Sequence, residues 1–346
     1  PDGQRLDDSI LGGKRMQVIG VDIACDSFVA FHPQDQTPQS FENTPKGFPC
    51  FQRWIRKTLP EVTETQVQVV MEATGIYWHK LADFLHRQGF RISVVNPAQV
   101  KFFARTQLKR SKTDQVDAKL IQHYGELIKP PVWQPAPEVL QTLQSTLKVL
   151  DEIKALQRME NNRLHALVRH VEDTEVLQKL AQERLELLDK QRQTLEARVV
   201  QLLKTDLLKD TVERLVSVPG IGMLTAALLI AETTLFQGLH SGRAIGAYAG
   251  LSPALRQSGK SSPRAHLSKM GNSRLRVAAF MAAQGATHSH SPLGVYFRRL
   301  VAGGKPYKVA LCALARKLLC IALAVFRSGM KYDPAVHMQE KPVAHA

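Results

Sequence analysis

Four carboxylates stand where strands are expected to end and a helix is expected to begin. Asp22 and Glu72 each close an apolar, strand-like run, and Asp114 and Asp117 are three residues apart in a helical pattern. That spacing puts the last two on one helix face, in the first turn, where the helix dipole favours their ionised form. Because hard oxygen donors without His or Cys suit Mg²⁺ or Mn²⁺, the four residues predict a divalent-metal site.

Each carboxylate also has a simpler interpretation. Asp114 taken alone is more simply an acid at a helix N-terminus, and Glu72 can cap the helix that follows it. Asp22 is the hardest to explain in this way, because a carboxylate at the end of a buried strand is costly without a partner. A strand-end Asp, a strand-end Glu and a helical pair, in that order, favour the metal site.

The positive charge of the chain is concentrated in one segment. The net charge is +15, and residues 233–332 contain 15 Lys and Arg but no Asp or Glu, whereas the rest of the chain is balanced at 31 basic and 31 acidic residues. A solvated face normally carries both signs, so this segment predicts phosphate binding, with nucleic acid as the first partner. Lys109, Arg110 and Lys112 add positive charge just before the predicted metal-binding helix.

One serine in the basic segment is a candidate nucleophile. Ser258 stands between Gln257 and Gly259, with Arg256 and Lys260 on either side. A hydroxyl in such a setting can attack phosphorus if a base or a metal takes its proton. Ser-Gly is a common loop dipeptide, so the residues by themselves favour this role only weakly.

The first third of the chain alternates strand and helix signals, which predicts an α/β domain with mixed strand pairing over residues 16–128. Strands are expected at 16–23, 27–32, 67–71 and 91–95, and helices at 48–59, 77–88 and 114–128. Residues 129–137 hold four prolines in nine positions and are expected to form a stiff linker.

The remainder is predicted to be helical. Apolar residues at alternating three- and four-residue steps run from 140 to 156 and again from 181 to 202. They predict an antiparallel hairpin or coiled coil over 138–210, broken near 172–174, whose role as spacer or dimer seam is open. Residues 211–332 are expected to form the basic domain and residues 333–346 a tail. Within the basic domain, residues 217–222 resemble the turn of a helix-hairpin-helix element, although Pro-Gly-x-Gly also makes ordinary turns.

Composition excludes several classes of protein. With 44% apolar and 22% charged residues, a disordered or fibrous chain is excluded. The four cysteines have no metal-ligand spacing, so reduced thiols in a cytoplasmic protein are expected. Residues 309–326 are apolar but carry Arg316 and Lys317 at their centre, which predicts that no segment spans a membrane. Residues 1–15, which precede Met16, are expected to be a remnant outside the fold.

Seven motifs in fixed order carry a family resemblance between Met16 and about Tyr332. They are Asp22, Glu72, Lys112-Thr-Asp-Gln-Val-Asp-Ala118, Ser217-Val-Pro-Gly-Ile-Gly222, Ala249-Gly-Leu-Ser-Pro253, Gln257-Ser-Gly259 and Ser268-Lys-Met-Gly-Asn-Ser-Arg-Leu-Arg276. As an ordered set they resemble the transposases of the insertion sequence 110 family, relatives of the Piv and MooV DNA invertases.

The resemblance implies a RuvC-like domain of the ribonuclease H fold, in which Asp22, Glu72, Asp114 and Asp117 form the metal-binding DEDD tetrad. It implies a mainly helical C-terminal transposase domain with Ser258 as the nucleophile, which forms a phosphoserine link to DNA; Ser261 and Ser262 stay open as alternatives. It further implies a noncoding bridge RNA that pairs with double-stranded donor and target DNA, and a bacterial cytoplasmic protein that acts at the nucleoid.

Nucleic-acid backbone is expected along the basic residues around the serine, which are Arg256, Lys260, Arg264, Lys269, Arg274 and Arg276. Since recombination joins two duplexes, a dimer or tetramer is expected. The sequence leaves open whether the chain serves a mobile element or is an invertase. Two other classes also stay open: a junction-resolving nuclease that uses water, and a non-catalytic nucleic-acid-binding protein with a degenerate metal site.

Overall fold

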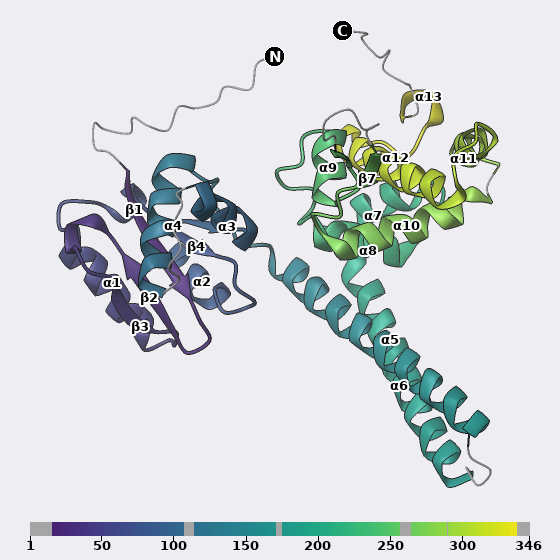
Figure 1. The fold of residues 1–346 in the computed structure, drawn as a ribbon, viewed down its shortest axis with the longest axis horizontal. Helices are drawn as coiled ribbons and strands as arrows, with labels where there is room; N and C mark the ends of the chain where they lie inside the picture. The colour runs from purple at the N-terminus through teal and green to yellow at the C-terminus, as the bar shows by residue number, and fades with distance from the viewer. Residues whose placement is uncertain (1–15, 107–113, 171–174, 257–263, 289, 338–346) are drawn as a thin grey trace. The chain divides into compact units, whose positions relative to one another are not determined.

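The computed structural model of the chain describes residues 16–106, 114–170, 175–256, 264–288 and 290–337. The chain divides into two compact units between Pro135 and Ala136. The first is an α/β unit, and the second is almost entirely helical (Figure 1). The α/β class predicted for the first part of the sequence and the helical class predicted for the rest are confirmed.

A five-stranded mixed sheet forms the centre of the α/β unit, with the strand order β3-β2-β1-β4-β5. The strands are β1 (Gln17–Ile23), β2 (Ser27–Phe31), β3 (Gln39–Glu42), β4 (Val67–Glu72) and β5 (Arg91–Val95), with short 3₁₀ turns at Pro33–Asp35 and Glu64–Gln66. The first three strands are antiparallel, whereas β4 runs parallel to β1 and β5 parallel to β4. β1 and β4 are buried along most of their length, which requires cover on both faces of the sheet.

Alternation along β1 separates two cores. Ile19 and Val21 belong to the core under α1 (Gly47–Thr58) and α2 (His79–Arg87), on one face of the sheet. Val18 belongs to the core under α3 (Pro97–Thr106) and α4 (Asp114–Ile128), on the other face. Because side chains of a strand alternate between faces, residues with even numbers in β1 point toward α4.

The proline-rich segment is held along β5 by buried polar groups. The Gln68 amide donates to the Ser93 hydroxyl at 2.8 Å and to the Pro130 carbonyl at 3.0 Å. The Ser93 hydroxyl donates to the carbonyls of Pro130 and Pro131, and the Trp133 amide donates to the Ile92 carbonyl at 2.7 Å. The chain therefore leaves the α/β unit only after Trp133.

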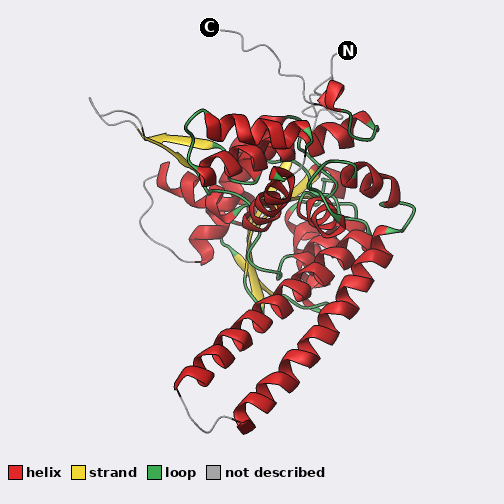
Figure 2. Cartoon of the chain, turned by 90° about the vertical axis from the view of Figure 1, so that its right-hand side faces the viewer, coloured by secondary structure: helices red, strands yellow, loops and turns green. Residues whose placement is uncertain are grey.

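Two long helices open the second unit, α5 (Glu138–His170) and α6 (Glu175–Leu203). Figure 2 shows them side by side. Glu160 of α5 pairs with Arg184 of α6, and Lys154 pairs with Glu196 at 3.4 Å, so the helices are antiparallel. Arg192, which interrupts the apolar pattern, forms ion pairs with Asp189 and Glu196 on its own helix.

The rest of the unit is a helical bundle with one small hairpin. Its elements are α7 (Lys209–Val216), α8 (Met223–Glu232), α9 (Gly242–Tyr248), β6 (Pro253–Arg256), β7 (Arg264–Leu267), α10 (Ser273–Thr287), α11 (Pro292–Ala302), α12 (Tyr307–Ser328) and α13 (Pro334–His337). α12 contacts α7, α9, α10 and α11. α10 buries five alanines, whose small side chains allow its neighbours to approach closely.

Within the described residues, α12 is the one helix long and apolar enough to cross a membrane, with a mean hydropathy of 2.2. In the most apolar 18-residue stretch of this helix, 56% is buried inside the protein. Ten of its residues, from Ala310 to Val325, lie in the core. Packing against the other helices of the unit accounts for its apolar composition.

Replacing Ser93 by Ala is expected to destabilise the α/β unit by about 1–3 kcal/mol, because the buried Gln68 amide and the Pro131 carbonyl each lose a partner. Urea unfolding followed by tryptophan fluorescence reports on this unit alone, since Trp54, Trp78 and Trp133 all lie in it. Ser40→Ala on the exposed strand β3 is the matched control and should leave the midpoint unchanged. Equal midpoints for Ser93→Ala and the wild type would contradict the proposed docking of the linker.

Candidate active site

Asp22 and Glu72 lie side by side at the carboxyl ends of two parallel strands. In the register of β1 and β4, Val21 lies opposite Met71, and the two carboxylates follow directly. Neighbours in a parallel register point to the same face of a sheet. Both residues therefore share the face of Gly20, which is the face that α4 covers.

The helix α4 crosses this face very closely and runs antiparallel to β1. A Cβ atom on Gly20 would collide with the backbone oxygen of Ala118. Seven residues further along the helix, a Cβ atom on Gly125 would lie 2.7 Å from side-chain atoms of Val18 and Val70. From one contact to the other, the residue number rises along α4, from 118 to 125, and falls along β1, from 20 to 18. The N-terminus of α4 consequently lies at the carboxyl ends of β1 and β4.

This arrangement brings the predicted acids to one edge of the sheet. α4 begins at Asp114, and Asp117 directly precedes Ala118, the residue that meets Gly20. Asp22, Glu72 and Asp117 are each half-buried, and each has an interaction within the protein. The side chain of Asp114 and the residues Lys109, Arg110 and Lys112 lie outside the described part of the chain.

The donor set is one of oxygen atoms. Of the described side chains, no three or more His, Cys, Asp or Glu are close enough to hold a metal ion, and that set does not include Asp114. The chemistry of the residues at this edge nevertheless fits Mg²⁺ or Mn²⁺, because they are carboxylates without His or Cys. Beside them, the Thr74 hydroxyl lies 3.5 Å from a Glu72 oxygen.

Asn43 joins the two loops that follow these strands. Its amide donates to the Ala24 carbonyl at 3.0 Å, in the loop after β1, and to the Tyr77 carbonyl at 3.1 Å, in the loop after β4. The neighbouring Cys25, through charge repulsion and a hydrogen bond, raises the pKa of Tyr77. The sequence analysis missed Asn43, since no local pattern marks a contact between segments so far apart.

In the helical unit, β6 and β7 form an antiparallel hairpin around the candidate serine. Ser258 and Lys260 belong to the connection 257–263, outside the described residues. In the register, Arg256, the last residue of β6, is opposite Arg264, the first residue of β7.

Arg276 fixes the base of this hairpin. Its Nη1 atom donates to the carbonyls of Ala249 at 3.0 Å and Lys269 at 3.2 Å. Gly250 has a φ of +67°, and a Cβ atom there would lie 2.6 Å from the same nitrogen. The sequence assigned Arg276 to nucleic-acid backbone, whereas here its guanidinium holds together two segments of the protein. Lys269 is exposed.

Arg274 is engaged by two carboxylates. Its guanidinium contacts Glu232 at 2.5 Å and Asp151 at 2.7 Å. Asn272 donates to the other Glu232 oxygen at 2.8 Å and accepts from the Leu275 amide, which caps α10. Glu232 thereby joins α8 to the start of α10. The sequence analysis missed it, although it is the last acid before the acid-free segment.

The two glycines of the 217–222 turn have different surroundings. Gly220 has a φ of +92°, and a Cβ atom there would collide with the Ala282 carbonyl oxygen of α10. Gly222, which precedes α8, has no atom within 4 Å of the equivalent position. The first glycine therefore serves helix packing, and only the second leaves open space at a helix N-terminus.

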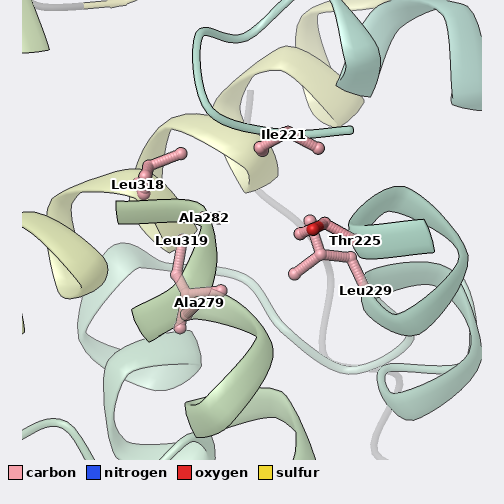
Figure 3. Close-up of a pocket in the computed structure, with 7 residues that line it drawn as sticks. All are labelled: Ile221, Thr225, Leu229, Ala279, Ala282, Leu318 and Leu319. Carbon is pink, nitrogen blue, oxygen red and sulfur yellow. The ribbon is translucent and has the colours of Figure 1, made fainter. Parts of the chain in front are cut away.

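Where α8, α10 and α12 meet, seven residues line a small pocket (Figure 3). They are Ile221, Thr225, Leu229, Ala279, Ala282, Leu318 and Leu319. Thr225 contributes the one polar side chain among them. The pocket is a packing gap in the helical core, and one threonine is too little to orient a substrate.

Comparison with known proteins places both units in one family. Residues 19–172 match the family model for DEDD transposases of IS110, described as "Transposase", and residues 212–297 match "Transposase IS116/IS110/IS902 family". The chain is similar to the pilin gene-inverting proteins of Moraxella bovis and Moraxella lacunata, at 30% identity over 324 residues, which is 92% of this chain and 98% of each relative. It is also 24% identical over 293 residues to the transposase for insertion sequence element IS1111A of Coxiella burnetii, with 76% of each chain covered.

Both matched family models describe transposases. The chain belongs to the IS110 family of transposases. The family resemblance predicted from the seven ordered motifs is thereby confirmed.

Glu232→Ala is expected to destabilise the helical unit by about 1–3 kcal/mol, because Arg274 and Asn272 each lose a partner that is 13% exposed. Urea unfolding followed by circular dichroism measures the change. Glu213→Ala is the matched control, since Glu213 is 67% exposed and pairs with Lys331 at 3.6 Å, so its loss should cost little. If both variants unfolded at the wild-type midpoint, Glu232 would not support the start of α10.

Proposed function

We propose that the chain is a DNA recombinase that cuts and rejoins strands at an edge formed by Asp22, Glu72, Asp114 and Asp117. The observation that carries this proposal is the antiparallel passage of α4 over Gly20, which places a helix N-terminus at the ends of β1 and β4. A mixed sheet with this strand order, acids on its central strands and further acids on a covering helix supports a RuvC-like fold.

The carboxylates would hold Mg²⁺ or Mn²⁺. When bound, such an ion neutralises charge on a scissile phosphate and activates the attacking oxygen. Asp22 and Glu72 supply ligands from rigid central strands, which fixes their separation. Asp114 and Asp117 supply ligands from the first turn of α4, where the helix dipole keeps them ionised.

Ser258 is the proposed nucleophile. Its hydroxyl gives up a proton as the oxygen forms a bond to phosphorus, the bond from phosphorus to the leaving DNA oxygen breaks, and that oxygen takes up a proton to become a free hydroxyl. The phosphoserine link conserves the energy of the phosphodiester, so the reverse attack by a hydroxyl on a new partner strand needs no nucleotide cofactor. The opposed Arg256 and Arg264 at the end of the hairpin support anion binding next to the serine. Lys260, Lys269 and the Lys109–Lys112 cluster would add contacts to nucleic-acid backbone.

Double-stranded donor and target DNA are the proposed substrates. The protein would bind them as a dimer or tetramer at the bacterial nucleoid. A bridge RNA that pairs with both DNAs would supply sequence specificity, as base pairing does in other RNA-guided proteins. The chain's own basic groups would then contact backbone, which positions nucleic acid without reading its sequence.

DNA inversion is the second candidate reaction. The observation that favours it is the 30% identity with two pilin gene-inverting proteins over 98% of their length, against 24% with the IS1111A transposase. Inversion and insertion use the same strand chemistry, and they differ in which DNA sites are joined.

The wild type is expected to form a protease-sensitive protein–DNA adduct on denaturing gels, with DNA of the gene's native flanks, RNA transcribed from those flanks, and Mg²⁺. Ser258→Ala should form none, because it lacks the attacking oxygen. Asp117→Asn should lower adduct formation at least about 100-fold, since several kcal/mol of charge stabilisation is lost.

Ser261→Ala and Ser262→Ala are the matched controls, and they should form adduct as the wild type does. Cleaved DNA without adduct, in both the wild type and Ser258→Ala, would contradict the serine mechanism and favour a resolving nuclease that uses water. Adduct formation by Asp117→Asn at the wild-type rate would contradict the role of the carboxylates.

A further inference from the structure

The loop after Glu72 displays two large side chains beside the carboxylate edge. β4 ends at Glu72, and Ile76 and Tyr77 are 65% and 41% exposed. Single exposed apolar side chains are ordinary. These two are adjacent in sequence and follow a proposed metal ligand by only four and five residues, so their exposure bears on what the site binds.

The backbone of this loop is held in place on both sides. Asn43 donates to the Tyr77 carbonyl at 3.1 Å, and the Tyr77 amide donates to the Thr74 carbonyl at 3.4 Å. The next residue, Trp78, packs edge-on against Trp133 of the docked linker, with ring centroids 5.6 Å apart. The loop therefore presents Ile76 and Tyr77 to solvent on a fixed backbone.

Two contacts within the loop involve the Tyr77 ring and Glu72. Gly75 has a φ of +56°, and a Cβ atom there would lie 3.4 Å from the Tyr77 Cε2 atom, so the ring rests on this glycine. The Thr74 hydroxyl in turn lies 3.5 Å from a Glu72 oxygen.

We propose that Ile76 and Tyr77 form a contact for the nucleobase next to the scissile phosphate of bound DNA. The inference rests on the proposed function, because it needs a phosphate at the carboxylate edge, and this loop begins directly after Glu72. Residues 73–78 carry no charged side chain, so they offer little to a phosphate. An exposed ring and an apolar neighbour suit the face of a base, which stacks on aromatic side chains or is wedged by apolar ones.

Photocrosslinking tests this contact. The probe is duplex DNA of the gene's native flanks, with single thymines replaced by 5-iodouracil, bound by the full chain and the flank RNA in Ca²⁺ to prevent cutting. Irradiation should attach the DNA to the peptide that contains Tyr77. Tyr77→Ala should abolish this attachment and weaken binding about tenfold, the loss typical of a removed base stack. Ile76→Ser should weaken binding several-fold.

Tyr77→Phe separates the ring from the hydroxyl and should attach and bind as the wild type does. Tyr307→Ala, which removes a 53% exposed ring from the helical unit, is the control and should also match the wild type. The proposal is overturned if Tyr77→Ala attaches and binds normally, or if Tyr77→Phe loses as much as Tyr77→Ala, which would assign the hydroxyl to a phosphate. Asp117→Asn should lose cutting in Mg²⁺ but keep the crosslink to DNA. Cutting therefore tests the proposed function, and crosslinking tests the base contact independently.

Discussion

The close contact between α4 and β1 at Gly20 is the constraint on which the candidate active site depends. A side chain at this position would collide with the backbone of α4 at Ala118 and move the helix away from the sheet. Asp117 directly precedes Ala118, and Asp22 lies two residues beyond Gly20 on the same face. One missing Cβ atom therefore sets how near the helix acids come to the strand acids. The same contact directs the positive end of the helix dipole toward the carboxylate edge, where it favours ionised ligands.

The two units divide the chemistry between them. The α/β unit supplies acids on rigid strands, whereas the helical unit supplies a segment without acids and a hairpin with opposed arginines. Part of that positive charge is used internally: Arg276 holds the base of the hairpin, and Arg274 pairs with Glu232 and Asp151. The pocket in Figure 3 is a gap in the helical core, lined almost entirely by apolar side chains.

Local pattern predicted most of the elements. Asp22 and Glu72 were predicted as metal ligands because each closes an apolar, strand-like run, and that role stays a prediction. β3 (Gln39–Glu42) and α3 were missed, since short polar or irregular segments carry little periodic signal. Asn43 and Glu232 were also missed, because each joins segments that become neighbours only on folding. The engagement of Arg274 depends on Asp151, 123 residues away, so charge alone could not show that this arginine is occupied.

The most direct test of the account is to map where a divalent ion binds. Fe²⁺ substituted for Mg²⁺, with ascorbate and peroxide, generates radicals that cut the polypeptide only near the ion. The account predicts fragments that end near residues 22, 72 and 114–117, suppressed by excess Mg²⁺ and absent in Asp22→Asn. Cuts confined to residues 136–346, or cuts that Asp22→Asn leaves unchanged, would contradict the claim that these strands and α4 form one metal site.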